Sequence, residues 1–343
     1  MQPRSFSLKV NHKIKPYNKS IEVDSDKSIS IRSFLIASIS QNVSVAKNIL
    51  ESEDVFSTIN CLKKLGVQIK KNGPKSYIIS GKGLGSLFAK KNLKLNFGNS
   101  GTLARLLIGI LSTTPCIEIK VQGDKSLNKR NMKKLIELMS EFGADFFPKK
   151  KFNFPLKLIS TEMPIGISYK AGISAQLKSA VILAGLNSYG TTRILEEKES
   201  RNHTENMLIK NPNVIKLKKS KKKLIEISGK KYLKPINIRI PGDPSSAAFF
   251  TALTILNKNS NLKIKKVGLN QTRVGFYELL KKHGAKIKFK NIKKNNNEIY
   301  GDIHIESSKI KPIKASREYY VKATDEYPIL FIIAALTKGL SIF

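Results

Sequence analysis

The chain has 343 residues, of which 41% are hydrophobic, and its 62 basic and 25 acidic residues give a formal net charge of +37. This length exceeds one ordinary core and predicts two domains. No run of 18 or more apolar residues occurs, which argues against a transmembrane helix. The basic N-terminal segment lacks the apolar stretch of a secretory signal. Cys61 and Cys116 lie far apart, without a His or Cys at metal-binding spacing, so we expect a cytoplasmic protein with no metal site.

The positive charge comes mostly from lysines scattered among Asn and Ile, as in "KNIKKNNNEIY". Aromatic residues do not alternate with these lysines, and no Arg-rich helix accompanies them, as would be typical of a nucleic-acid interface. We therefore interpret the charge mainly as a compositional bias toward lysine. A small anionic substrate and a polyanion such as a nucleic acid remain open as alternatives.

The predicted elements repeat along the chain. An amphipathic helix, a glycine turn and a strand are predicted at 58–71, 132–147 and 276–289, with Gly66, Gly143 and Gly284 in the turns. A degenerate copy without the glycine is predicted at 201–217. The copies lie at multiples of about 70 residues, which is the mark of a repeated supersecondary unit.

Helices with small polar or glycine-rich N-terminal turns form a second repeated element, predicted at 25–39, 98–111, 172–186, 241–256 and 324–336. Side chains suited to anions lie in or near these turns: Lys27, Ser28, Arg32, Gly101, Arg105, Lys125, Arg130, Ser174, Gln176, Lys178, Arg201 and His203. Ordinary capping explains any one turn, but their common spacing favours phosphate or carboxylate sites. Asp325 and Glu326 begin the last helix, where an N-cap and an acid–base role both remain open.

The fifth repeat begins at Thr324, and the sequence stops in "GLSIF", where a glycine turn leads into a strand. The helix–turn–strand half of this repeat is absent, and the strand edge would lack a partner. We therefore expect a repeat array that is truncated in its fifth unit.

In this order, the polar blocks resemble the 5-enolpyruvylshikimate-3-phosphate synthase family. The blocks are "SDKSISIRSF", "FGNSGTLARLL", "GDKSLNKRNM", "GISAQLKSAVILAGL", "SRNHTENML", "PGDPSSAAFF", "QTRVGFYELLKKHGA" and "TDEYPILFIIAAL". They span essentially the whole chain, and "PGDPSSAAFF" and "DEYPIL" resemble the class II branch. The resemblance implies a two-domain inside-out α/β barrel, with a discontinuous first domain of 1–23 plus 241–343 and a second domain of 24–240 that holds three repeats.

The resemblance also implies the reaction. An enolpyruvyl group passes from phosphoenolpyruvate to the 5-hydroxyl of shikimate 3-phosphate, phosphate leaves, and neither a metal nor an organic cofactor is needed. We expect small-molecule partners only, no specific nucleic acid, no membrane and a monomer. The anionic substrates would explain the basic side chains at helix N-termini.

The family's functional positions fall on this chain as follows. Shikimate 3-phosphate is expected at Lys27, Ser28, Arg32, Ser174, Gln176, Arg201 and Asp325. Phosphoenolpyruvate is expected at Lys27, Gly101, Arg130 and Gln176, with Arg105 in support. Asp325 and Lys27 are the expected catalytic residues, Asp325 as the acid–base group at the 5-hydroxyl. Gly101 predicts sensitivity to glyphosate, because resistant class II relatives tend to carry Ala there.

The chain departs from the family pattern at several positions: Ser25 replaces Gly, Ile31 replaces His, Asn131 replaces Pro and Asn202 replaces Asp. Family segments that carry a second acid–base carboxylate and most of the phosphoenolpyruvate clamp have no counterpart before Phe343. We therefore expect impaired activity from this chain.

Two alternatives remain. UDP-N-acetylglucosamine enolpyruvyl transferases share the fold and use a loop Cys, but Cys116 lies at a predicted strand start without a Gly-rich loop, which is typical of a core residue. A non-catalytic polyanion-binding homologue would use the net charge instead. His203 and His283 are expected to be surface or capping residues.

Overall fold

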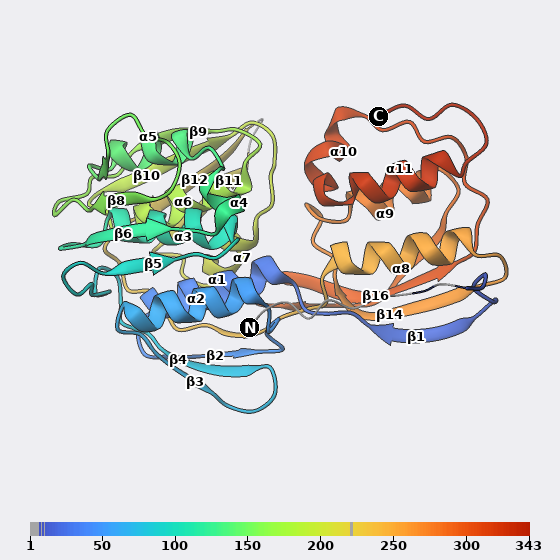
Figure 1. Ribbon diagram of the computed structural model, residues 1–343, viewed down its shortest axis with the longest axis horizontal. Helices are drawn as coiled ribbons and strands as arrows, with labels where there is room; N and C mark the ends of the chain where they lie inside the picture. Colours follow the sequence, from blue (N-terminus) through green and yellow to red (C-terminus); the bar gives the residue numbers. More distant parts are fainter. Residues whose placement is uncertain (1–6, 8, 10, 220–221) are drawn as a thin grey trace.

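The computed structural model describes residues 7, 9, 11–219 and 222–343, which form two lobes side by side (Figure 1). Buried hydrophobic residues gather in two clusters, one drawn from residues 29–240 and the other from residues 247–333. We call residues 24–240 the second lobe, and β1 (Asn18–Glu22) together with residues 241–343 the first lobe. The predicted domain boundaries stay a prediction, and residues 1–6, 8 and 10 of the predicted first domain lie outside the described residues. In the described ranges, no helix has the length and apolarity that a bilayer crossing requires.

Three inner helices form the centre of the second lobe: α1 (Lys27–Ile39), α3 (Gly101–Ser112) and α6 (Ala175–Leu186). All three are buried along most of their length, and α3 packs closely against α6. An apolar sequence all round a helix is typical of such burial. The remaining helices of this lobe are α2 (Glu53–Lys64), α4 (Lys125–Asn128), α5 (Lys133–Glu141) and α7 (His203–Leu208).

Three four-stranded sheets cover the inner helices, in the strand orders β13-β2-β4-β3, β5-β6-β8-β7 and β11-β12-β10-β9. In each sheet one outer pair is parallel and the other two pairs are antiparallel. The strands are β2 (Val43–Lys47), β3 (Gln68–Lys71), β4 (Ser76–Ser80), β5 (Lys94–Asn96), β6 (Glu118–Gln122), β7 (Asp145–Phe147), β8 (Leu156–Ile159), β9 (Ser168–Ala171), β10 (Thr191–Glu196), β11 (Ile215–Lys219), β12 (Lys223–Ser228) and β13 (Asn237–Arg239).

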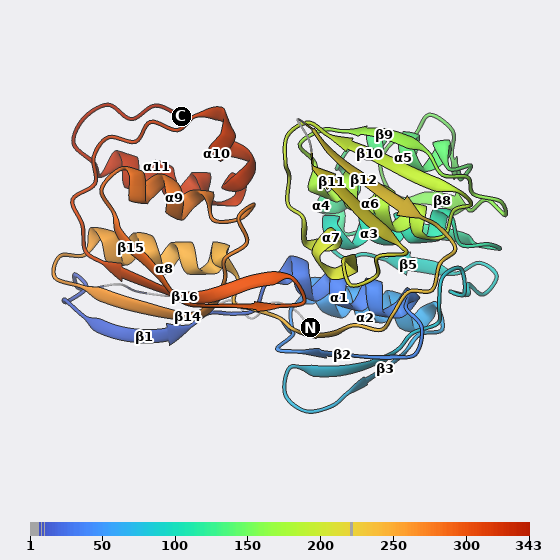
Figure 2. The ribbon, with the colours of Figure 1, turned by 180° about the vertical axis from the view of Figure 1, so that it is seen from behind.

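The first lobe contains a fourth sheet of the same pattern, β1-β14-β16-β15, in which only the β1–β14 pair is parallel. Its strands are β1 (Asn18–Glu22), β14 (Asn261–Gly268), β15 (Lys286–Asn295) and β16 (Glu298–Glu306). Its helices are α8 (Pro244–Leu256), α9 (Gly275–Lys282), α10 (Arg317–Lys322), the short 3-10 helix η1 (Thr324–Glu326) and α11 (Tyr327–Ala335). The orange β15–β16 hairpin extends toward the second lobe (Figure 2).

The shared sheet pattern confirms the repeat that the sequence predicts. The turn glycines Gly66, Gly143 and Gly284 follow α2, α5 and α9 and have φ values of +87°, +100° and +99°. Glycine fits these turns because a Cβ disfavours positive φ. The degenerate copy is α7 followed by β11. Cys116 differs from expectation: it is exposed, with a φ of +56°, in the turn before β6, and is not a core residue.

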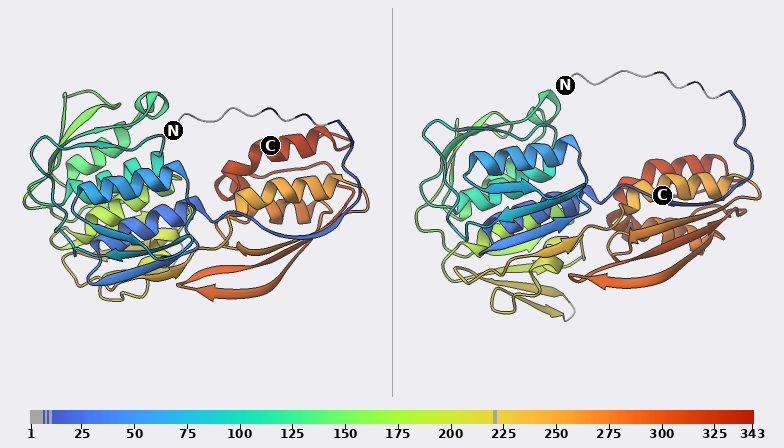
Figure 3. Two further views of the ribbon diagram at one scale, coloured as in Figure 1. Left: turned by 60° about the horizontal axis from the view of Figure 1, so that its bottom comes forward. Right: turned by 90° about the horizontal axis from the view of Figure 1, so that it is seen from below.

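Two chain crossovers join the lobes and run beside each other (Figure 3). The backbone N–H of Asp26 donates to the carbonyl of Pro241 at 2.9 Å, and that of Asp243 donates to the carbonyl of Asp24 at 2.8 Å. Each crossover leads directly into a helix, α1 in the second lobe and α8 in the first. The helix N-termini of both lobes therefore meet at the waist of the molecule.

Candidate functional site

A cavity of about 150 Å³, which we call the interlobe pocket, lies between the two lobes beside the start of α1. The second lobe lines it with Ser28, Arg32, Ile173, Ser174, Ala175, Gln176, Arg201 and His203, and the first lobe with Tyr320, Val321, Thr324 and Asp325. Six of the seven residues expected at shikimate 3-phosphate are among them. The structure therefore brings this predicted group together from segments far apart in the sequence.

The inner helices begin at side-chain caps. The Asp26 carboxylate accepts from the N–H of Ile29 at 2.8 Å, and the Ser100 and Ser174 hydroxyls accept from the N–H groups of Leu103 and Leu177 at 3.3 and 3.4 Å. A cap satisfies only one of the unpaired N–H groups in the first turn of a helix. The positive ends of α1, α3 and α6 consequently favour an anion near them.

Arg32 is the most deeply buried cation of the interlobe pocket, with 3% of the residue exposed. Its guanidinium donates to the hydroxyl of Thr204 at 3.0 Å, to the carbonyl of Ser28 at 3.0 Å and to the hydroxyl of Ser179 at 3.4 Å. No carboxylate of the described residues lies within ion-pair distance of it. Burial lowers the pKa of Arg32 to about 10, and the charges of Asp26 and Glu205 offset this effect only in part. The pocket therefore holds a guanidinium that none of the described carboxylates pairs directly.

Arg201 and Asp325 both line the pocket, and they belong to different lobes. Nη2 of Arg201 donates to Oδ2 of Asp325 at 2.6 Å. The next residue, Glu326, is buried, and its carboxylate accepts from the hydroxyl of Ser245. Burial raises the pKa of Glu326 above its ordinary range. The two adjacent carboxyl groups of η1 thus have different surroundings, because Asp325 is half-exposed and faces the pocket.

A second group of predicted residues lies beside the pocket, around the start of α3. Nη1 of Arg105 donates to Oε1 of Gln176 at 2.8 Å and to the carbonyl of Gly101 at 3.0 Å. The guanidinium of Arg130 donates to Asn99 at 2.9 Å. Burial, and secondarily the charge of Arg130, lowers the pKa of Arg105. Neither Arg105 nor Arg130 has a carboxylate partner in the described part of the chain.

Gly101 lies between these two arginines. A Cβ built on it would stand 2.8 Å from Nη1 of Arg105 and 2.9 Å from Nη1 of Arg130. Such distances are shorter than real contacts allow, so only glycine leaves both guanidinium groups where they are. The predicted group Gly101, Arg105, Arg130 and Gln176 is therefore assembled at one place.

Of the residues expected at shikimate 3-phosphate, Lys27 is the one that does not line the interlobe pocket. Its ammonium pairs with Oδ2 of Asp54 at 3.1 Å, and half of its side chain is exposed. Lys178, which the sequence also places near the third polar turn, is fully buried and pairs with Glu196 at 2.7 Å and Glu205 at 2.8 Å. Lys178 is therefore paired within the protein and does not line the interlobe pocket.

The expectation that His203 is a surface or capping residue is wrong. His203 is 2% exposed, lines the pocket, and its Nδ1 lies 2.8 Å from Oε1 of Glu298 in the first lobe. Burial alone would raise the pKa of Glu298, but His203 and the amides of Asn206 and Asn270 hold it below the ordinary value. By contrast His283 is a cap, as expected, at the end of α9.

Sequence reasoning missed Glu298 as well as Arg273, a buried cation at the waist between the lobes. Glu298 stands in "KNNNEIY", which gives no signal other than a polar turn. Arg273 stands in "QTRVGFYELL", one of the blocks that carry the family resemblance, and this membership is the signal that could have identified it.

A model of the family described as EPSP synthase (3-phosphoshikimate 1-carboxyvinyltransferase) matches residues 11–343. A curated 3-phosphoshikimate 1-carboxyvinyltransferase from Petrotoga mobilis is 39% identical over 94% of this chain and 74% of its own length. One from Bacillus subtilis is 37% identical over 96% of this chain and 76% of its own length. The chain thus spans about three quarters of these relatives.

Solved structures give the same result. EPSP synthase from Acinetobacter baumannii superposes with a TM-score of 0.84 at 33% identity, over 95% of this chain and 73% of that one. The enolpyruvyl transferase NikO from Streptomyces tendae, at 11% identity and a TM-score of 0.71, shares the fold. These matches confirm the predicted enolpyruvyl transferase fold, and the chain belongs to the EPSP synthase family.

Proposed function

We propose that this chain transfers the enolpyruvyl group of phosphoenolpyruvate to the 5-hydroxyl of shikimate 3-phosphate, a step toward chorismate and the aromatic amino acids. The observation that carries the proposal is the buried Arg32 guanidinium, which faces the interlobe pocket without a counterion. Breaking or omitting one partner of a buried ion pair is costly, so such a group favours an anionic ligand. A phosphate accepts the forked donors of a guanidinium and supplies the missing charge.

Shikimate 3-phosphate would occupy the interlobe pocket. Arg32, Arg201 and Ser28 would hold its phosphate or hydroxyl groups, together with Ser174 and Gln176 at the start of α6. Asp325 would lie at the 5-hydroxyl from the side of the first lobe. Since Arg201 pairs with Asp325 at 2.6 Å, binding of a phosphate would free this carboxylate for the hydroxyl.

Phosphoenolpyruvate would bind beside it, over the start of α3. Gly101 leaves room there, Arg130 and Arg105 supply positive charge, and Gln176 joins this group to the interlobe pocket. Lys27 would have to leave Asp54 to reach either substrate. Its long flexible side chain is half-exposed, so this rearrangement requires no movement of the fold.

The reaction follows from this placement. Asp325 accepts the proton of the 5-hydroxyl as the hydroxyl oxygen bonds to C2 of phosphoenolpyruvate, while C3 gains a proton. The C–O bond to phosphate then breaks, C3 loses a proton, and the double bond forms again. Lys27 and the arginines stabilise the charge of the phosphate that leaves. Both reactants are held in one cleft, which replaces a bimolecular encounter.

The proposal also includes the cellular location and the oligomeric state of this chain. We propose a cytoplasmic monomer that acts on these two small molecules and has no specific nucleic-acid partner. The family resemblance implies no metal or organic cofactor for this chemistry. The high lysine content is then a compositional property rather than an interface.

Calorimetric titration of the 343-residue chain with shikimate 3-phosphate, with and without phosphoenolpyruvate, tests the proposal, followed by a phosphate-release assay. We expect measurable binding that Arg32→Met weakens at least about a hundredfold, because the variant removes a charge-assisted hydrogen-bond donor. Lys47→Met, at an exposed strand end, is the matched control and should bind as the parent does.

The alternatives predict other outcomes. Binding of UDP-N-acetylglucosamine in place of shikimate 3-phosphate would favour the sister transferase. Tight nucleic-acid binding with a steep salt dependence, and no binding of either small molecule by a folded chain, would favour the polyanion-binding homologue.

A further inference from the structure

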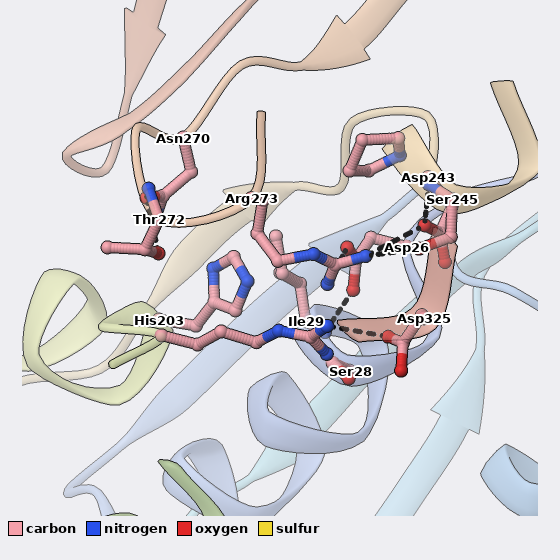
Figure 4. A network of polar contacts seen from close by, with 12 residues as sticks. Asp26, Ser28, Ile29, His203, Asp243, Ser245, Asn270, Thr272, Arg273 and Asp325 are labelled. Atoms are coloured by element: carbon pink, nitrogen blue, oxygen red, sulfur yellow. Dashed lines mark hydrogen bonds and ion pairs between the residues drawn. The ribbon is translucent and has the colours of Figure 1, made fainter. Parts of the chain in front are cut away.

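One turn of the first lobe, residues 270–273, reaches between the lobes and touches two segments of the second lobe that carry the proposed site (Figure 4). The amide of Asn270 donates to Oδ1 of Asn202 at 2.8 Å, next to Arg201. Nη1 of Arg273 lies 3.3 Å from Oδ2 of Asp26, next to Lys27 and Ser28. This turn therefore contacts the start of α1 and the segment before α7 at the same time.

Arg273 joins both crossovers through one guanidinium. Besides Asp26, its Nη2 lies 3.2 Å from Oδ1 of Asp243 and donates to the hydroxyl of Ser245 at 2.8 Å. Only 2% of the residue is exposed. Asp26 and Asp243 are the N-caps of α1 and α8, so one guanidinium contacts the capping residues at the starts of both helices. The planar fork of arginine can meet two carboxylates at once, whereas an ammonium is a point charge.

Hydrogen bonds also connect Arg273 to the part of the first lobe that lines the interlobe pocket. The Ser245 hydroxyl that accepts from Arg273 donates to the carboxylate of Glu326. Glu326 and Asp325 are adjacent in η1. Arg273 is thus linked on one side, through Asp26, to the helix start that presents Ser28, and on the other side, through Ser245, to the 3-10 helix that presents Asp325.

We propose that Arg273 is a positioning residue that fixes the start of α1 and the 3-10 helix η1 relative to each other, so that Ser28 and Asp325 face one bound substrate. Arg273 itself does not line the interlobe pocket. This inference rests on the proposed function, because it takes shikimate 3-phosphate as the ligand. In this proposal, the contacts of Arg273 at the waist contribute to substrate affinity as well as to holding the two lobes together.

If Arg273 had only a structural role, its replacement would lower stability without changing the contribution of Ser28 to affinity. A double-mutant cycle distinguishes this structural role from the proposed positioning role. We measure the affinity of the full chain for shikimate 3-phosphate in Arg273→Lys, Ser28→Ala and the double variant. We expect a loss of about tenfold for Arg273→Lys and about fivefold for Ser28→Ala, with less than twentyfold for both, because coupled sites are not additive. A loss of about fiftyfold in the double variant, or a change below twofold in Arg273→Lys, would overturn the proposal.

Two further variants control for folding. Asp243→Asn keeps a helix N-cap but removes one charge from Arg273, and we expect a weaker version of the same coupled loss if Arg273→Lys does not fold. Tyr277→Phe removes a hydrogen bond to the carbonyl of Pro244 in the same lobe and changes neither the charge of Arg273 nor that of its partners. It should lower the melting temperature and leave the affinity within twofold.

Hydrogen exchange in the ligand-free chain gives a readout that does not depend on the proposed function. Arg273→Lys should speed exchange at the amide of Ile29, which Asp26 caps, and at residues 324–326, while Tyr277→Phe should not affect Ile29. Failure of the parent chain to bind shikimate 3-phosphate would refute the proposed function. Unchanged exchange at both segments in Arg273→Lys would refute the coupling itself.

Discussion

Arg201 and Asp325 belong to different lobes, and their side chains form a 2.6 Å ion pair in the lining of the interlobe pocket. The carboxylate is half-exposed, and exposed ion pairs typically contribute about 0–1 kcal/mol to stability. The pair therefore adds little to the fold. Its importance is that Asp325 engages the guanidinium of Arg201, which a phosphate would otherwise bind.

Replacement of Asp325 by Asn should distinguish the effect of this ion pair on stability from its effect on phosphate binding. We expect the free energy of unfolding to change by less than about 1 kcal/mol, because only an exposed pair is lost. Inorganic phosphate should bind at least about threefold more tightly, because Arg201 no longer has an internal anion competing for it. Phosphate release from phosphoenolpyruvate should fall at least about a hundredfold, the usual size of an acid–base contribution. Calorimetry and a phosphate assay check these expectations, and unaltered release would remove Asp325 from the reaction.

Replacement of Gly101 by Ala tests the group around α3. The new Cβ would come within 3 Å of both Nη1 of Arg105 and Nη1 of Arg130, so these side chains must move, while the backbone need not. We expect a stability change within about 0.5 kcal/mol and an affinity for phosphoenolpyruvate reduced about tenfold. Glyphosate should bind the parent chain and bind the variant much more weakly. Gly172→Ala is the control, since its Cβ would meet open space. Equal binding by parent and Gly101→Ala would refute this site.

Several of these features can be predicted from the sequence because they are local. Turn glycines such as Gly66 and caps such as Ser174 depend on residues only a few positions away. The polar helix starts, spaced at a common interval, also predict that anion-binding side chains converge. Their grouping in one pocket follows from the repeat, since equivalent helices of a repeat point the same way.

The partners across the waist could not be predicted in this way. His203 and Glu298, or Arg273 and Asp26, meet only after the two lobes have formed, and neither pairing leaves a periodic pattern in the sequence. The side-chain direction of Lys27 is equally a tertiary property, set here by Asp54. For Cys116 the local sequence led to the wrong prediction. Its apolar neighbours indicated burial, whereas the residue is exposed in a turn and has a positive φ.

Replacement of Lys178 by Met tests the buried charge cluster behind the pocket. The ammonium is fully buried between Glu196 and Glu205, and Lys223 approaches these carboxylates only to 3.5 and 3.8 Å. Removing one partner of a buried pair typically costs about 3–5 kcal/mol. We expect a loss of this size in urea unfolding, and partial recovery when Glu205→Gln is added. Lys218→Met, which breaks an exposed pair, should cost less than about 1 kcal/mol.

The contact between His203 and Glu298 predicts a pH dependence of stability. The pKa of Glu298 lies below 4.5 in the folded chain, because His203 and two amides outweigh the effect of burial. A carboxyl group with a lowered folded pKa stabilises the fold above its unfolded value, and this stabilisation disappears as the pH falls through the folded value. Glu298→Gln should therefore be less stable than the parent at pH 7, by about 1–3 kcal/mol for hydrogen bonds to a charged group.

This difference between Glu298→Gln and the parent should begin to shrink below pH 4.5, where the unfolded chain takes up a proton, and disappear as the pH falls through the lowered folded pKa of Glu298. Denaturant unfolding at a series of pH values measures it directly. Glu306→Gln provides the matched control, because that carboxylate is half-exposed and lies 4.0 Å from its lysine partner. A Glu298→Gln deficit that stays constant from pH 7 to pH 3 would show that the contact acts through shape and hydrogen bonding, and that the charge of Glu298 does not hold the lobes together.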